Sequence, residues 1–226
     1  MSMLIAIDTA TRFASIALYE PDRVRAEYTW QTNDNHTVEL MPTVVEMMKR
    51  QGVDPAQLGA VAVSTGPGSF TGLRIGLAVG KGLALGLDIP LLGIPTLDIL
   101  PYAVGEVSLP TWSIIQAGRG RLCYAEYRYH RGVWRRQGDF EVGSAAQFSE
   151  RLEGFAVACG ELTKADIEVI RGRFGDAVVI TPPAFATRRA AFLADLAWRR
   201  LERGEQEDLM ALSPLYLHHP GVVCSA

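Results

Sequence analysis

The chain is expected to be an α/β protein made of two similar halves, each with the order β-β-β-α-β-α around a mixed sheet. Apolar runs of strand length alternate with longer helix-like segments in both halves. Two pairs of segments also echo each other: 62–66 resembles 156–160, and 5–8 resembles 114–116. A duplicated α/β unit with two mixed sheets accounts for all three observations. The predicted halves are residues 1–105 and 106–226.

Strands of the first half are predicted at short apolar or alternating runs bounded by turn residues, at residues 3–7, 13–19, 24–30, 60–64 and 91–94. Helices are predicted at residues 36–51, 70–87 and 96–104. The polar cluster Asn33–Asn35 is suited to begin the first of these helices, and Gly52 to end it.

The second half repeats this order. Its predicted strands are residues 111–116, 122–129, 133–140, 155–159 and 177–180. Its predicted helices are residues 145–152, 163–171 and 185–203.

Composition indicates an ordinary globular protein of the cytoplasm. The 226 residues are 48% hydrophobic and 21% charged, and the net charge is -3. The three cysteines are widely spaced and form neither a metal cluster nor a disulfide framework. The N-terminus lacks a basic region, so no signal peptide is expected. Residues 75–92 are apolar, but Lys81 and Asp88 interrupt them, which favours a buried helix over a membrane span.

A glycine-rich turn at residues 66–72 follows a predicted strand and opens a predicted helix, which is the setting of phosphate-binding loops. Its spacing fits neither the Walker loop nor the dinucleotide fingerprint. The alternative is a structural turn, in which glycine allows unusual backbone angles, proline stiffens the chain and a hydroxyl caps the helix. The residues assigned to this turn are Gly66, Pro67, Gly68, Ser69, Thr71 and Gly72.

The helix after this turn is apolar on almost all sides. Gly72, Gly76 and Gly80 share one face at spacings of four, although each glycine costs about 1 kcal/mol relative to alanine. Close backbone approach would offset that cost. A helix without a polar face needs cover on more than one side. We therefore expect one side to pack on the sheet and the other on a helix or a partner chain.

Helix 36–51 carries an apolar stripe with two methionines, which suits either a core or an adaptable protein contact. The two helices together form the predicted partner interface. Its residues are His36, Val38, Met41, Val44, Val45, Met48, Leu73, Arg74, Leu77 and Lys81.

Metal and nucleotide chemistry have weak support in the sequence. Four residues after His36 stands Leu40, so a two-histidine helix site is incomplete, and His218-His219 are adjacent near the C-terminus. Asp8 ends the first strand, where it could hold Mg²⁺ or cap a turn. Its equivalent in the second half is Gln116, which is neutral, so no two-carboxylate clamp is expected.

A basic run spans residues 119–136. It contains six arginines against Glu126, with aromatic residues interleaved. This mixture suits contact with RNA. The competing interpretation, which we favour, is a solvated hairpin with alternate residues in the core.

Several motifs together resemble the bacterial TsaB (YeaZ) family. They are residues 5–11 (IAIDTAT), 36–42 (HTVELMP) and 66–76 (GPGSFTGLRIG), with 95–97 (PTL) and 214–217 (PLYL) in support. The resemblance covers most of the chain and rests chiefly on the glycine segment. It implies an actin-like/Hsp70-like ATPase fold of two RNase H-like halves.

The resemblance also implies a function. Members of the family serve in making N6-threonylcarbamoyladenosine beside the anticodon of tRNAs that read codons starting with A. The implied role is that of a non-catalytic subunit that heterodimerises with a TsaD-like catalytic subunit, is joined by a TsaE-like ATPase, and homodimerises when alone. ATP and metal would belong to the partner subunits, with tRNA reached through the complex. The alternative is an enzyme of the same fold, either an ATP-binding phosphotransferase or a metallopeptidase-like protein.

Overall fold

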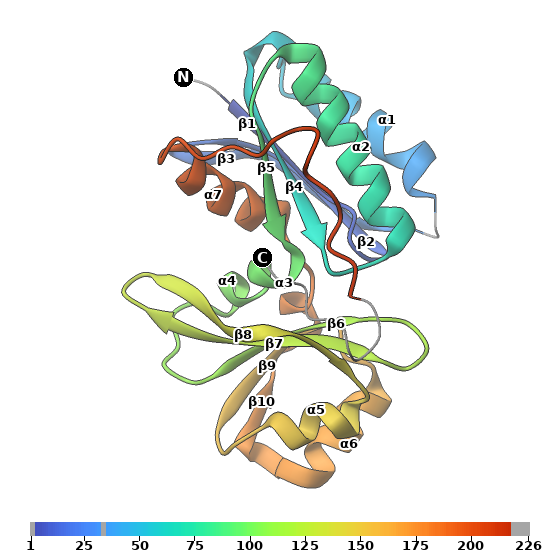
Figure 1. Cartoon of the computed structure of the whole chain (residues 1–226), viewed down its shortest axis with the longest axis vertical. Coiled ribbons are helices and arrows are strands. Elements are labelled where there is room, and N and C mark those ends of the chain that lie inside the picture. Colours follow the sequence, from blue (N-terminus) through green and yellow to red (C-terminus); the bar gives the residue numbers. More distant parts are fainter. Residues whose placement is uncertain (1–2, 33–34, 218–226) are drawn as a thin grey trace.

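The chain forms two lobes, each built on one five-stranded mixed sheet (Figure 1). The computed structural model describes residues 3–32 and 35–217. The strand order is β3-β2-β1-β4-β5 in one sheet and β8-β7-β6-β9-β10 in the other. In both sheets the first three strands pair antiparallel, and the last two run parallel to the first. The predicted duplication is therefore confirmed at the level of topology.

The first lobe, which holds strands β1–β5, is the upper lobe in Figure 1. Its elements lie close to their predicted positions. Its strands are β1 (Met3–Asp8), β2 (Phe13–Glu20), β3 (Arg23–Gln31), β4 (Leu58–Gly66) and β5 (Leu91–Pro95). Its helices are α1 (His36–Arg50), α2 (Phe70–Leu87) and α7 (Ala190–Leu201), with a short 3₁₀ turn at Pro55–Gln57.

The lower lobe contains the strands β6 (Thr111–Gln116), β7 (Leu122–His130), β8 (Val133–Gly143), β9 (Ala156–Gly160) and β10 (Val178–Ile180). Its helices are α5 (Ala145–Arg151) and α6 (Lys164–Phe174). Two short helices, α3 (Thr96–Ile99) and α4 (Pro101–Val104), connect the lobes in place of the single predicted helix. They divide at Pro101, which has no N–H to continue a helix.

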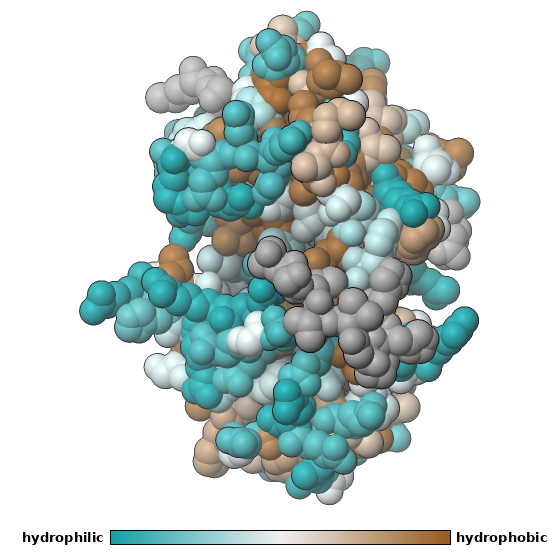
Figure 2. Space-filling model, in the orientation of Figure 1, coloured by the Kyte–Doolittle hydropathy of each residue, from teal (hydrophilic) through white to brown (hydrophobic). Residues whose placement is uncertain are grey.

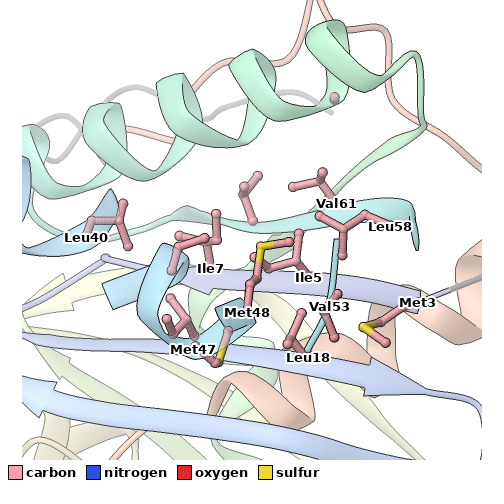
Figure 3. Close-up of a cluster of buried hydrophobic side chains, with 14 of the residues drawn as sticks. Met3, Ile5, Ile7, Leu18, Leu40, Met47, Met48, Val53, Leu58 and Val61 are labelled. Atoms are coloured by element: carbon pink, nitrogen blue, oxygen red, sulfur yellow. The ribbon is translucent and has the colours of Figure 1, made fainter. Parts of the chain in front are cut away.

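The upper sheet is covered on both faces, because successive residues of a strand point to opposite sides. On β1, Ile5 and Ile7 pack against α1 and α2 within one hydrophobic cluster, part of which is shown in Figure 3. Leu4 and Ala6 face the other way and pack against α7. That second face is rich in alanine on both the sheet and the helix, which allows α7 to lie close to the strands.

The last helix differs from the prediction in extent and in place. It was expected over residues 185–203 in the second half, but it begins at Ala190, and Phe185 ends a 3₁₀ turn. It packs on the sheet of the first lobe. The following segment then runs along β5, where Glu207 N donates to Leu91 O at 2.9 Å. The last strand of the first sheet, β5, ends at Pro95 and the first strand of the second, β6, begins at Thr111, but the second half of the chain returns to cover the first sheet.

Helix α2 packs on the sheet through its glycine face. A Cβ at Gly72 or Gly76 would collide with Thr9, and one at Gly80 with Val63. Each glycine therefore permits a contact that alanine would block, as the sequence predicted. Within the described residues, α2 is also the one helix long and apolar enough to cross a membrane. A buried core helix of a globular protein meets the same criterion, and the glycine face of α2 packs on the sheet.

Alanine substitutions along α2 test this packing. We expect Gly76→Ala to lower the free energy of unfolding by roughly 1–3 kcal/mol, because the new methyl group overpacks the contact with Thr9. Gly82→Ala is the matched control, because no atom lies within 4 Å of a Cβ at Gly82. It should raise stability by about 1 kcal/mol through helix propensity. Urea unfolding of both variants measures the effect, and two changes of the same sign would contradict the packing assignment.

Candidate functional site

A buried charge network lies where the two lobes meet. Asp8 ends β1, and its side chain is completely buried. Its Oδ1 accepts hydrogen bonds from Ser64 Oγ at 2.8 Å and from Ala10 N at 2.9 Å. Its Oδ2 accepts from Arg188 Nε at 2.7 Å. Both oxygens of this carboxylate are therefore engaged by groups of the chain itself.

Arg188 joins Asp8 to the other lobe. Its Nη1 donates to Glu161 Oε1 at 2.6 Å, and Glu161 follows the last residue of β9. Its Nη2 donates to Thr11 Oγ1 at 2.7 Å, and Thr11 in turn donates to Glu161 Oε1 at 2.6 Å. One guanidinium thus connects the end of β1, the middle strand of one sheet, with the end of β9, an inner strand of the other.

The electrostatics of Arg188 favour its charged form. Burial of the guanidinium would by itself lower the pKa of Arg188, but the charges of Asp8 and Glu161 outweigh that effect and raise the pKa. A buried cation flanked by two carboxylates is stable only while all three groups remain together. The network is therefore a fixed connection between the lobes.

Sequence reasoning missed two members of this network. The sequence compared Asp8 only with Gln116, its equivalent in the second half, whereas the carboxylate that shares Arg188 with Asp8 is Glu161. Gln116 instead donates to the backbone of Glu161 at 2.9 Å. A signal was present: the repeat of 62–66 at 156–160 places Glu161 directly after the duplicated strand. No comparable signal pointed to Arg188.

The glycine turn packs against the turn that follows Asp8. Ser69 N donates to Ala10 O at 2.6 Å, and Ser69 Oγ caps α2 by accepting from Gly72 N at 3.2 Å. Gly68 lies so close to Ala10 that a Cβ would overlap its carbonyl oxygen. Among the residues assigned to this turn, Gly66 has a positive φ of 113°, Pro67 is buried and Thr71 is exposed. The amides of Ser69 and Gly72 are thus occupied by the chain.

Within the described part of the chain, the residues considered for metal binding do not come together as a metal site. His36 is buried at the start of α1, with Nε2 3.0 Å from Thr11 O. Among residues 3–32 and 35–217, no three His, Cys, Asp or Glu side chains are grouped so as to hold a metal ion. His218 and His219 lie outside the described residues. Burial raises the pKa of the Cys123 and Cys159 thiols to about 12, so both resist ionisation.

The predicted partner interface divides into buried and exposed residues. The buried set consists of His36, Val44, Met48, Leu73 and Leu77. These side chains belong to the interior of the upper lobe, so in this conformation they cannot contact a partner directly. The remaining set reaches the surface, with Val38, Val45 and Arg74 exposed and Met41 and Lys81 half-buried.

Further apolar residues of α2 reach the same surface. Phe70 is 51% exposed and Leu85 is 76% exposed, while Val38 and Val45 of α1 are 67% and 57% exposed. Between Phe70 and Leu85 the outward positions of α2 include Ala78 and Gly82, which present little side chain. Hydrophobic residues accordingly gather over this part of the upper lobe in Figure 2. We call the exposed residues of α1 and α2 the two-helix face.

The C-terminal segment reaches the edge of the two-helix face. Leu215 N donates to Thr65 O at 2.7 Å, which holds this segment beside the glycine turn. Tyr216 then packs on Phe70, with ring centroids 4.9 Å apart, and its hydroxyl accepts from Arg74 Nε at 2.7 Å. Arg74 also lies over the Phe70 ring at 3.7 Å. The N-terminal end of α2 is therefore fixed by residues from the far end of the chain.

A second buried contact between the lobes involves Asp98 of α3. Tyr127 of β7 donates to Asp98 Oδ1 at 2.6 Å. Burial raises the pKa of Asp98, and the hydrogen bond from Tyr127 and the charge of Arg136 only partly oppose that effect. The folded chain therefore holds a proton on Asp98 more tightly than the unfolded chain does.

Comparison with known proteins places the chain among tRNA-modification proteins. A family model described as TsaD, tRNA N6-adenosine threonylcarbamoyltransferase, matches residues 28–214. The protein TsaB of Escherichia coli K12 is 35% identical over 134 residues, which are 58% of this chain and 58% of that protein. TsaB of Bacillus subtilis 168 is 35% identical over 130 residues, 58% of this chain and 57% of that protein. The matched segment thus spans little more than half the length of these curated relatives.

Solved structures match over nearly the whole chain. YeaZ from Pseudomonas aeruginosa has a TM-score of 0.79 at 25% identity, covering 96% of this chain and 100% of that one. Component A of (R)-2-hydroxyglutaryl-CoA dehydratase from Acidaminococcus fermentans has a TM-score of 0.50 at 8% identity, covering 87% and 97%. The second likeness concerns the fold alone.

Two lobes with sheets of equal strand order define a protein of the actin-like/Hsp70-like ATPase fold, built from two RNase H-like halves. This confirms the predicted fold class. Within that class, the chain belongs to the TsaB (YeaZ) family.

Adjacent arginines provide a test of the buried network. Arg188→Met should lower the free energy of unfolding by about 3–5 kcal/mol, because it leaves the buried Asp8 without its charge partner. Arg189→Met is the matched control, because Arg189 is half-exposed and pairs with Glu27 at 2.6 Å. Its loss should stay within about 1 kcal/mol. If denaturant unfolding gave equal losses of stability for the two variants, the buried network would contribute no more than the exposed ion pair.

The raised pKa of Asp98 predicts a pH-dependent effect. The contribution of Asp98 to stability should fall as pH rises above the ordinary value of 3.8 and through the raised folded pKa, and the penalty is fully present once pH exceeds that folded pKa. Asp98→Asn removes this penalty. The stability of the variant relative to the natural chain should therefore increase as pH rises above 3.8. Asp139→Asn, at an exposed position, controls for simple loss of charge. Parallel stability curves for Asp98→Asn and the natural chain would contradict the assignment.

Proposed function

We propose that the chain is a non-catalytic subunit in tRNA threonylcarbamoyladenosine biosynthesis, and that it acts by pairing with a TsaD-type catalytic subunit. The names of its relatives support the pathway. The observation that carries the pairing is the two-helix face. It exposes Val38, Val45, Phe70 and Leu85, and the outward side of α2 carries a single exposed charge, Arg74.

A protein partner suits the two-helix face for two reasons. Apolar side chains that stay exposed on neighbouring helices gain free energy when another chain covers them. Ala78 has a small side chain and Gly82 has none, which would also let the partner's backbone approach α2 closely. We therefore expect the partner to cover α2 between Phe70 and Leu85, with α1 contributing Val38 and Val45.

A non-catalytic role is supported by groups that are already engaged. Both oxygens of Asp8 are occupied within the chain, and Arg188 stands beside them where a metal ion would have to bind. The backbone amides of Ser69 and Gly72 already donate hydrogen bonds to acceptors of the chain itself. These residues do not fit a magnesium–nucleotide complex, so we assign ATP and metal to the partner subunits.

The remaining assignments belong to the same proposal. A TsaE-like ATPase would join the pair, and tRNA would be reached through the assembled complex in the cytoplasm. In the absence of the catalytic subunit, a second copy of the chain would cover the two-helix face as a homodimer.

Charge insertion on the two-helix face tests the pairing. Val45→Arg combined with Leu85→Arg should weaken binding to the TsaD-type subunit about 100-fold or more, because it buries unpaired charge at the interface. Titration calorimetry or size-exclusion chromatography of the mixed subunits measures this. Leu77→Arg, an obvious choice from the sequence, is unsuitable because Leu77 is buried and the variant would disturb the fold.

Val169→Arg is the matched control, because Val169 is an exposed residue of α6 in the other lobe. It should leave assembly unchanged. If the face variant assembles as well as the control, the interface assignment is wrong. The enzymatic alternative is tested by calorimetry of the isolated chain with Mg-ATP and with Zn²⁺. Tight binding accompanied by turnover would overturn the non-catalytic role.

A further inference from the structure

The hairpin formed by β7 and β8 projects from the lower lobe and has a strongly basic end (Figure 1). Between Glu126 and Asp139 the sequence has no carboxylate. The basic residues of this stretch are Arg128, His130, Arg131, Arg135 and Arg136. In Figure 2 this extension is mostly hydrophilic. A chain with a net charge of -3 thus concentrates positive charge on one protruding ribbon.

Most of this charge is not neutralised within the chain. Arg128 pairs with Glu126 at 2.6 Å. Arg136 lies over the Phe140 ring at 3.9 Å. Among the described residues, no carboxylate lies within ion-pair distance of Arg131, Arg135 or Arg136. The charge of Arg136 also acts on the buried Asp98, so the guanidinium groups of Arg131 and Arg135 are the ones best placed to bind an external anion.

Two residue choices in the hairpin are unfavourable for folding. Arg131 occupies the turn with a φ of 50°, a left-handed conformation that Asn, Asp and Gly adopt far more readily. Arg128 is paired directly with Arg135 across the two strands, and like charges opposite each other destabilise a sheet. Both choices add positive charge to the same end of the ribbon. Local rules broken without a gain in packing are characteristic of functional sites.

The aromatic residues of the hairpin do not face outward. Tyr127 and Trp134 are buried, and Tyr129 packs on Trp134 with ring centroids 5.3 Å apart. Of the interleaved aromatics, Tyr127 and Trp134 are thus turned into the core, and Tyr129 is half-buried against Trp134. What the outer surface offers is exposed guanidinium groups together with His130, and a guanidinium pairs bidentately with phosphate.

We infer that the basic end of the β7–β8 hairpin binds the phosphate backbone of RNA. Arg131 and Arg135 contact the phosphate groups, and Arg128 adds to the positive electrostatic potential around them. A membrane surface suits this hairpin less well, since Trp134 is buried and no large hydrophobic side chain is exposed between Tyr127 and Gln137. An acidic protein also suits it less well, since stable protein interfaces have an apolar centre. The identity of the RNA as tRNA rests on the proposed function.

Fluorescence anisotropy with a tRNA transcript and the full chain tests this inference. Replacing Arg131 and Arg135 together by Gln should raise the Kd about tenfold at 0.1 M salt, and the slope of log K against log salt should become shallower by about two. Replacing the same pair by Lys should restore most of the affinity. The matched control replaces Arg171 and Arg173, exposed on α6, by Gln and should leave Kd and slope unchanged.

Thermal melting separates these effects from misfolding. The Gln pair should melt no lower than the natural chain, because it removes the repulsion between Arg128 and Arg135. Unchanged RNA affinity and slope in the Gln pair would overturn the inference, as would an equal loss in the α6 control. Poly-glutamate that competes with tRNA and loses affinity in the Gln pair would point to an acidic protein instead.

Assembly with the TsaD-type subunit is scored on the same variants. Normal assembly with unchanged RNA affinity refutes the hairpin inference and leaves the proposed function intact. Failed assembly by the natural chain, with an RNA response as expected, refutes the proposed function instead.

Discussion

One buried arginine holds the two halves of this molecule together. The guanidinium of Arg188 contacts Asp8 at the end of β1, the middle strand of one sheet, and Glu161 just after β9, which pairs with the middle strand β6 of the other sheet. Removing three charged groups from water is costly, and the arrangement is stable because each charge has hydrogen-bonding partners. A side chain of the protein thus fills the junction between the lobes. These ion pairs thereby tie the two lobes together from the inside.

The position of the two-helix face depends on close packing beneath α2. Because Gly72, Gly76 and Gly80 are used to bring α2 onto Thr9 and Val63, the helix lies low on the sheet and its opposite side stays accessible. Its N-terminal end is further positioned by Tyr216. The sheet, the glycine turn and the C-terminal segment therefore jointly set the shape of one surface.

The sequence was sufficient for the local elements and for the duplication, since both depend on short-range periodicity. Phe70–Leu87 was predicted to the residue, because a serine cap and an apolar run define it. Contacts between distant residues were not predictable in this way. Arg188 lies 180 residues from Asp8, and nothing near Arg188 distinguishes it from the exposed Arg189. The apolar stripe of α1 likewise predicted an amphipathic helix correctly, but it could not tell that Val44 and Met48 are core while Val45 is exposed. Which partner covers a given face depends on three-dimensional packing that periodicity does not encode.

The position of α7 has a consequence for synthesis of the chain. The upper sheet is complete in sequence once β5 has been made, yet the helix that covers its alanine-rich face ends at Leu201, about a hundred residues later. At ordinary translation rates that interval lasts about 5–20 s. Throughout it, one face of the sheet and the β5 edge, which Arg200 and Glu207 later occupy, remain uncovered. The N-terminal lobe is therefore completed only after the strands of the C-terminal lobe have been synthesised.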